Sequence, residues 1–193
     1  MLTQLSTVKA RLAIAEADTQ FDALLTSFIQ AASTIFDAAT GRRLARGEDL
    51  IHEFTAHLTE ICVGCYPVES VSLFEVKSND LIGWVLADPP DYLVRHDCVI
   101  SLPHPLGTVN QQARVIYTGG YVLPGSTPAP GQTPLPADLE HAAVEQVAGW
   151  FLHRDKTGLV RNWPSGGVYQ QFIQTPLLPA VEAILKRYER WTL

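Results

Sequence analysis

The sequence predicts an α+β protein: a small helical bundle formed by the N- and C-terminal helices, with an antiparallel β-rich insertion in the middle. Three observations predict this class. Apolar residues recur at helical spacing near both ends of the chain. Between about residues 50 and 118 their period falls to two, as in strands with one buried face. Residues 122–136 hold five prolines and separate the β part from the second helical part.

Residues 1–50 are predicted to form two helices. Leu5, Val8 and Leu12 lie at helical spacing and indicate a short first helix. A longer apolar face runs from Phe21 to Phe36, and Gly41 offers the left-handed conformation that commonly ends a helix. The second helix is therefore the strongest element prediction in the chain.

Residues 51–121 are predicted to form the β insertion, arranged as an antiparallel meander. Phe54, Ala56 and Leu58 alternate with polar residues, which is typical of a strand. Further strands are expected in four β-like runs separated by Pro, Gly, Asn and Asp: 70–76, 81–86, 92–102 and 113–118. The insertion closes on a structural turn whose glycines permit a sharp bend and whose tyrosines cover the core edge: Tyr117, Gly119, Gly120 and Tyr121.

Residues 137–193 are predicted to form the C-terminal helices of a single 193-residue domain. An extended Pro/Gly connector, residues 122–136, leads into a helix whose buried face includes Leu139, Val147 and Trp150. A long loop at residues 157–175 follows, and long loops in compact domains are usually functional or mobile. Apolar residues from Leu177 to Tyr188 then return to helical spacing.

Composition excludes several classes of protein. The formal net charge of −6 and the pI of about 5.4 argue against a basic groove that binds nucleic acid. No stretch approaches the roughly 18 apolar residues of a membrane span, and the N-terminus lacks the pattern of a secretory signal. We therefore expect a protein made in the cytoplasm, with no membrane partner. Only 18% of its residues are charged, which favours a surface that meets a partner protein.

Three cysteines are the sharpest chemical feature. Cys62 and Cys65 have the spacing of a zinc or redox pair, but a structural zinc needs two more ligands, for which Cys98 and a histidine are weak candidates. We interpret all three as buried packing residues, and expect neither metal nor cofactor. No nucleophile or phosphate-binding motif is present, so the chain is predicted not to be an enzyme. A small zinc- or thiol-dependent enzyme and a small-ligand binding module stay open as alternatives.

The order of local patterns resembles one family: the head–tail connector (adaptor) proteins of tailed bacteriophages and prophages, of the gp6-like type. The resemblance covers both ends of the chain well and the β insertion poorly. It rests on five segments in a fixed order: Leu5–Leu12, Asp22–Ala32, Val115–Tyr121, Leu135–Arg154 and Leu178–Tyr188.

This resemblance implies a structural protein that joins the capsid portal to the tail. Its copies would form a ring of about a dozen, bound to the portal and to a downstream head–tail joining or tail protein, and DNA would pass through without sequence-specific binding. It would be made in the bacterial host cytoplasm and reside in the virion, with a head-completion stopper or a tail terminator as related alternatives. The candidate interface residues are Trp163, Tyr169, Phe172, Arg187, Tyr188, Arg190 and Trp191.

Overall fold

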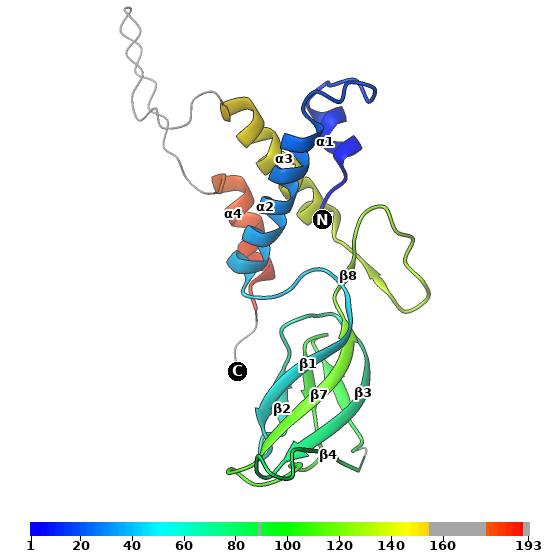
Figure 1. Cartoon of the computed structure of the whole chain (residues 1–193), viewed down its shortest axis with the longest axis vertical. Coiled ribbons are helices and arrows are strands. Elements are labelled where there is room, and N and C mark those ends of the chain that lie inside the picture. Colours follow the sequence, from blue (N-terminus) through cyan, green and yellow to red (C-terminus); the bar gives the residue numbers. More distant parts are fainter. Residues whose placement is uncertain (89, 155–176, 191–193) are drawn as a thin grey trace, which may run out of the picture. The chain divides into compact units, whose positions relative to one another are not determined.

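A computed structural model describes residues 1–88, 90–154 and 177–190 (Figure 1). The chain divides into two compact units. The helical unit comprises Met1–Phe36 and Pro136–Tyr188, and the β unit comprises Asp37–Leu135 and Glu189–Leu193. Helices therefore come from both ends of the chain and strands from its middle, which confirms the predicted α+β class.

Four α-helices are described, two before and two after the strands. Their bounds are α1 Leu5–Arg11, α2 Asp22–Thr40, α3 Ala137–His153 and α4 Pro179–Leu185, which continues into the 3₁₀ helix η2, Lys186–Tyr188. Gly41 has a φ of +63°, so the left-handed residue predicted to end the second helix is present. Proline at the first position of α4 fits a helix start, because the N–H that proline lacks would have no hydrogen-bond partner within the helix at that position.

The core of the helical unit joins α1, α2 and α3. Phe21 packs edge-to-face on Phe151 with ring centroids 5.2 Å apart, and Phe28 packs on Trp150 at 5.9 Å. The buried members of this core are Val8, Leu25, Ile29, Ala32, Val144, Val147 and Phe151. Val144 was not predicted to be buried, whereas the other members lie on the predicted apolar faces.

Two buried polar side chains are satisfied inside this unit. Lys9 is 3% exposed, and its ammonium lies 2.8 Å from Asp22 Oδ1 and donates to the Glu16 carbonyl at 2.8 Å. Gln146 is buried on α3, and its Oε1 accepts from the Leu178 N–H at 2.8 Å. Because buried polar groups need partners, these bonds fix the loop after α1 and the start of α4.

The described residues of the β unit form two antiparallel sheets and one short parallel pair. The four-stranded sheet has the order β1-β7-β3-β4, the three-stranded sheet β2-β6-β5, and β8 pairs with β9. The strands are β1 Gly47–Thr55, β2 Glu60–Cys62, β3 Val68–Lys77, β4 Trp84–Leu86, β5 Leu93–Arg95, β6 Val99–Ser101, β7 Gln112–Gly119, β8 Tyr121–Val122 and β9 Thr133–Pro134.

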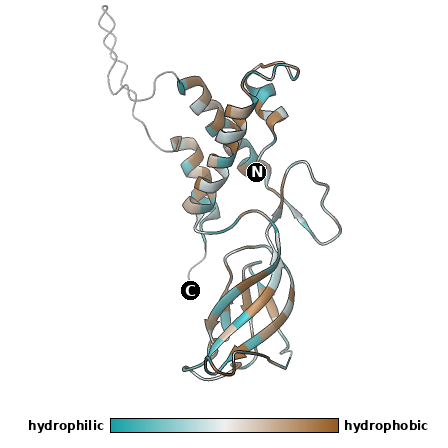
Figure 2. Cartoon of the chain, in the orientation of Figure 1, coloured by the Kyte–Doolittle hydropathy of each residue, from teal (hydrophilic) through white to brown (hydrophobic). Residues whose placement is uncertain are grey.

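The core of the β unit is built from the inward faces of these strands. Along β7 the buried residues are alternate ones, namely Ala113, Val115, Tyr117 and Gly119. Figure 2 shows both hydrophobic and hydrophilic bands along the strands. Residues of both larger sheets contribute to one buried cluster, which includes Ile61, Val63, Phe74, Val99, Ile100, Leu102, Val115 and Tyr117.

The strand order differs from the predicted meander. Among the described strands, only β3–β4 and β5–β6 are hairpins of consecutive strands, whereas β1 pairs with β7 across more than fifty residues. The run 92–102, predicted as one strand, is two strands because His96 and Asp97 have φ of 49° and 59° and form a turn. The expected extended connector also contributes a strand, since Thr133 and Pro134 pair with β8. Strand β2 was not predicted at all.

Candidate functional site

The predicted turn at the end of β7 is a place where only glycine fits. A Cβ on Gly119 would lie 2.7 Å from the Pro67 carbonyl oxygen. Gly120 has a φ of +103°, and a Cβ there would lie 2.8 Å from the Cα of Arg46. Its N–H donates to the Pro67 carbonyl at 2.8 Å. The two glycines therefore let β7 approach neighbouring backbone and turn sharply.

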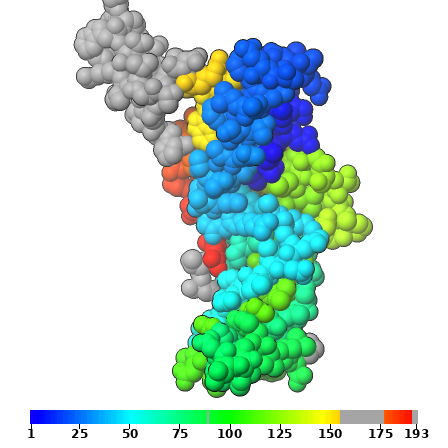
Figure 3. Space-filling view, in the orientation of Figure 1, coloured from blue at the N-terminus to red at the C-terminus, as the bar shows by residue number. Residues whose placement is uncertain are grey.

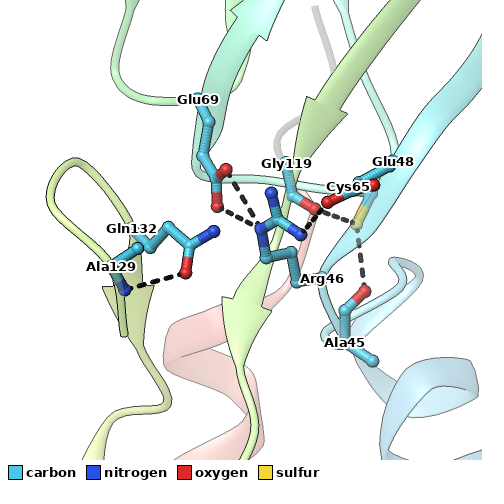
Figure 4. Close-up of polar contacts among 8 residues, drawn as sticks. All are labelled: Ala45, Arg46, Glu48, Cys65, Glu69, Gly119, Ala129 and Gln132. Carbon is cyan, nitrogen blue, oxygen red and sulfur yellow. Dashed lines mark hydrogen bonds and ion pairs between the residues drawn. The ribbon is translucent and has the colours of Figure 1, made fainter. Parts of the chain in front are cut away.

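Cys65 is built into the same turn. Its thiol donates to two carbonyl oxygens, that of Gly119 at 3.3 Å and that of Ala45 at 3.4 Å (Figure 4). Its N–H donates to the Tyr117 hydroxyl at 3.1 Å. Burial raises the pKa of the Cys65 thiol, and raises the pKa of Tyr117 to about 12. Both groups are therefore neutral, packed and hydrogen-bonded near neutral pH.

A buried arginine stacks beside this turn. The Arg42 side chain is 5% exposed, and its guanidinium carbon lies 3.4 Å from the centroid of the Tyr66 ring and 5.2 Å from that of Tyr121. Its Nη2 donates to the Tyr66 carbonyl. The aromatic faces offset part of the desolvation of the charge. No local sequence motif marks this stack, because Arg42 and its aromatic partners are far apart in the sequence.

Ion pairs tie the strands around the turn. Arg46 Nε lies 2.9 Å from Glu69 Oε1, and its Nη1 lies 2.8 Å from Glu48 Oε1 (Figure 4). Glu69 is the better shielded of the two carboxylates, because its side chain is 13% exposed and that of Glu48 is 70% exposed. The contact with Glu69 therefore contributes more to stability than the contact with Glu48.

Two candidate interface residues contact the first turn of α3. The Tyr188 hydroxyl donates to Asp138 Oδ1 at 2.7 Å, and Arg187 Nη2 lies 3.3 Å from Asp138 Oδ2. The Arg187 side chain is 65% exposed, so most of its surface is still open to another molecule.

Arg190 belongs to the β unit, and both its backbone and its side chain bind other residues of that unit. Its N–H donates to the Thr40 carbonyl at 2.7 Å, and its Nη2 donates to the Cys62 carbonyl at 2.8 Å. Beside it, the Tyr66 hydroxyl donates to the Glu189 carbonyl at 3.4 Å. An interface role for Arg187, Tyr188 and Arg190 stays a prediction. The other four candidates, Trp163, Tyr169, Phe172 and Trp191, lie outside the described residues.

The three cysteines are free thiols: Cys62 is half-buried, and Cys65 and Cys98 are buried. Across residues 1–88, 90–154 and 177–190, no group of three or more His, Cys, Asp or Glu side chains could hold a metal ion. Burial raises the pKa of Cys98 to about 11. Such a thiol is almost entirely protonated at neutral pH, and therefore a poor nucleophile.

Within the part of the chain that the structure describes, no helix has both the length and the apolar character needed to cross a bilayer.

Comparison with known proteins finds likeness in structure but not in sequence. No protein-family model matches the chain, and no curated protein matches it. A chain in the neck of an empty gene transfer agent (GTA) particle, computed with C6 symmetry, matches with a TM-score of 0.59 at 16% identity. The match covers 97% of this chain and 89% of that chain.

A chain in the virion of a native gene transfer agent particle matches equally well. Its TM-score is also 0.59, at 14% identity, again over 97% of this chain and 89% of that one. The chain shares their fold. Because the matches cover nearly the whole chain, the helical ends and the β-rich middle both belong to the common fold.

Proposed function

We propose that the chain is a non-catalytic structural protein of the neck of a phage-like particle, where the head joins the tail. One observation carries this proposal: the fold is shared over 97% of the chain with a protein of a gene transfer agent neck. The resemblance of the terminal segments to head–tail connectors supports the same place in the particle. That resemblance comes from local sequence patterns, so it is a separate line of support.

The copies form a closed ring of about a dozen around the path of the DNA. The neck that holds the similar chain was computed with C6 symmetry, and chains placed off a sixfold axis occur in multiples of six, which a dozen satisfies. Each copy carries a net charge of −6. A wall built from such copies repels phosphates rather than gripping them, so DNA passes without sequence-specific binding.

The ring binds the portal protein of the capsid on one side and a downstream head–tail joining or tail protein on the other. The chain is made in the cytoplasm of the bacterial host and ends in the virion. Arg187, Tyr188 and Arg190 are proposed as partner contacts, together with four aromatic candidates: Trp163, Tyr169, Phe172 and Trp191.

The test is native mass spectrometry of the purified protein across a concentration series, with negative-stain images of any large species. We expect a closed ring of about a dozen copies. Because the portal could act as a template, the series is repeated with portal rings added. A protein that stays monomeric under both conditions contradicts the proposal.

A chain that ends at Ile184 tests the C-terminal contacts. It lacks Tyr188 and Arg190, and we expect it to lose ring formation. The full-length variants Tyr188→Phe and Arg190→Gln serve as milder versions, and circular dichroism checks that each variant keeps its helices. Rings of normal size from a folded truncated chain would remove these residues from the proposed interface.

A further inference from the structure

One end of the β unit exposes a group of aliphatic side chains. We call it the tip surface and define it as Leu81, Ile82, Val85, Leu86 and Val109. These residues come from the β3–β4 turn, from β4 and from the loop before β7, at the end of the β unit far from β8 (Figure 1). In Figure 3 residues of this part of the sequence, in green, cover that end.

The segments that form the tip surface are held together. Gln111 Nε2, from the loop before β7, donates to Ser78 Oγ at 2.7 Å. In the β3–β4 turn, the Ile82 N–H donates to Asn79 Oδ1 at 2.9 Å. The exposed aliphatic residues are therefore carried by a hydrogen-bonded scaffold.

The exposure of these side chains is unusual for a folded protein. Leu81 is 99% exposed, Leu86 65% and Ile82 63%. Covering such a side chain removes apolar surface from water, which favours binding of a partner. Monomeric proteins rarely leave contiguous apolar patches open unless the patch binds something.

A cavity opens into the tip surface. Its volume is about 430 Å³, enough for apolar side chains of another molecule. It is lined by six apolar and three polar residues: Val76, Val85, Leu86, Ala87, Pro105 and Leu106, with Ser78, Asp88 and His104.

Pairing of a foreign strand along β4 is disfavoured. Strand β4 has three residues and lies at the edge of its sheet, and the sequence continues after it into Asp88 and two prolines. Short edge strands followed by proline resist strand addition. A partner is therefore expected to insert its side chains into the cavity rather than to pair a strand with β4.

The charges around the tip surface select the partner. Residues 76–92 hold three aspartates and one lysine, and Lys77 is already paired with Asp80. The side chain of Asp80 is nevertheless 93% exposed, and Asp88 lines the cavity. A second copy that met the tip surface with its own tip would place the same aspartates opposite Asp80 and Asp88, whereas a surface rich in Lys and Arg fits well.

We propose that the tip surface binds a different protein of the particle, not a second copy of this chain. An apolar side chain of that protein enters the cavity, and its Lys or Arg residues face Asp80 and Asp88. This inference rests on the proposed function, because it takes the chain to be part of a particle.

Covalent footprinting with a photo-generated carbene tests this proposal in three states of the protein: the dilute isolated chain, the isolated ring and the purified particle. We expect the tip surface to be labelled strongly in the chain and the ring, and several-fold less in the particle. Protection already in the isolated ring overturns the inference in favour of contacts between copies. Undiminished labelling in the particle overturns it too, and both results leave the neck assignment intact. Absence of the chain from particles overturns the proposed function and this inference together.

A variant pair gives a second readout. Leu81→Ser with Ile82→Ser removes two exposed side chains, and Ile51→Ser, 56% exposed on β1, is the matched control. We expect both proteins to form rings, and the tip variant alone to lower the yield of tailed particles at least several-fold in a producing strain that lacks the natural gene. Loss of rings in the tip variant alone, or an equal yield from the two proteins, contradicts the proposal.

Discussion

Alanine at Gly120 is expected to weaken the β unit far more than alanine at Gly131. Both glycines have a left-handed backbone, with φ of +103° and +87°. They differ in the space around them: a Cβ at Gly120 would lie 2.8 Å from Arg46 Cα and from Cys65 Sγ, whereas one at Gly131 would meet nothing within 4 Å. The pair therefore separates steric overlap from backbone strain.

The magnitudes follow from three terms. A left-handed backbone costs a residue with a Cβ about 1–2 kcal/mol. Alanine also reduces the entropy of the unfolded chain, which offsets about 0.4–1 kcal/mol. Overlap in a packed site adds about 1–3 kcal/mol, and only at Gly120. We expect Gly131→Ala to cost about 1 kcal/mol and Gly120→Ala about 3 kcal/mol.

Native-state hydrogen exchange of the β1 and β7 amides measures this difference, because it reports the opening free energy of the β unit separately from that of the helical unit. Adding Cys65→Ala to Gly120→Ala removes one of the two atoms that the new Cβ would overlap, the Cys65 sulfur, but leaves the Arg46 backbone in place. We therefore expect the double variant to recover little of the lost stability. Equal losses for Gly120→Ala and Gly131→Ala would refute the argument that close backbone packing requires glycine at this turn.

Three further predictions concern buried polar groups. Lys9→Met is expected to lower the free energy of unfolding, measured with urea, by about 2 kcal/mol, which is less than for a fully buried pair because Asp22 is 29% exposed. Adding Asp22→Asn is expected to recover part of that loss, because it removes the carboxylate left without its partner. A loss near zero for Lys9→Met contradicts this prediction. At about pH 9 only about one per cent of Cys98 is thiolate, so we expect this residue to be alkylated slowly until the protein unfolds. Mass spectrometry measures the alkylation, and rapid labelling of Cys98 in the native protein would contradict the prediction by showing that the thiol is accessible. Burial raises the pKa of Asp37, so the folded state holds its proton more tightly and stability falls as the pH rises above the ordinary value of about 4. Asp37→Asn can still accept from the Leu44 N–H but cannot ionise, so we expect it to gain stability relative to the natural protein between about pH 4 and pH 7. A difference in the free energy of unfolding between the two proteins that stays constant over this pH range would contradict the argument.

Local patterns were sufficient for the helices and for the longer strands. The apolar faces around Phe28 and Val147 repeat every three to four residues, and such a face has to be buried wherever the helix packs. The left-handed turn at Gly41 was predictable because glycine adopts that conformation at little cost. These features depend on neighbours within about two turns of helix, which the sequence displays directly.

Strand order and the polar contacts depend on residues far apart. β1 pairs with β7 rather than with the next strand, and no local pattern distinguishes two strands that alternate in the same way. The stack of Arg42 on Tyr66 and Tyr121 brings together side chains separated by up to 79 positions. The tip surface was missed for a related reason, because Leu81 and Leu86 looked like ordinary strand residues until the fold left them without a cover.

The sequence by itself determined the class of fold, the helical ends, the acidic charge and the glycine turn, because each follows from composition or from contacts between near neighbours. Tertiary structure alone decided which strands pair, that Arg190 binds the Cys62 carbonyl, and that the Cys98 thiol is held protonated by burial. The physical reason is that burial and long-range pairing are properties of the packed chain, and one residue's partners are set by all the others that compete for the same core.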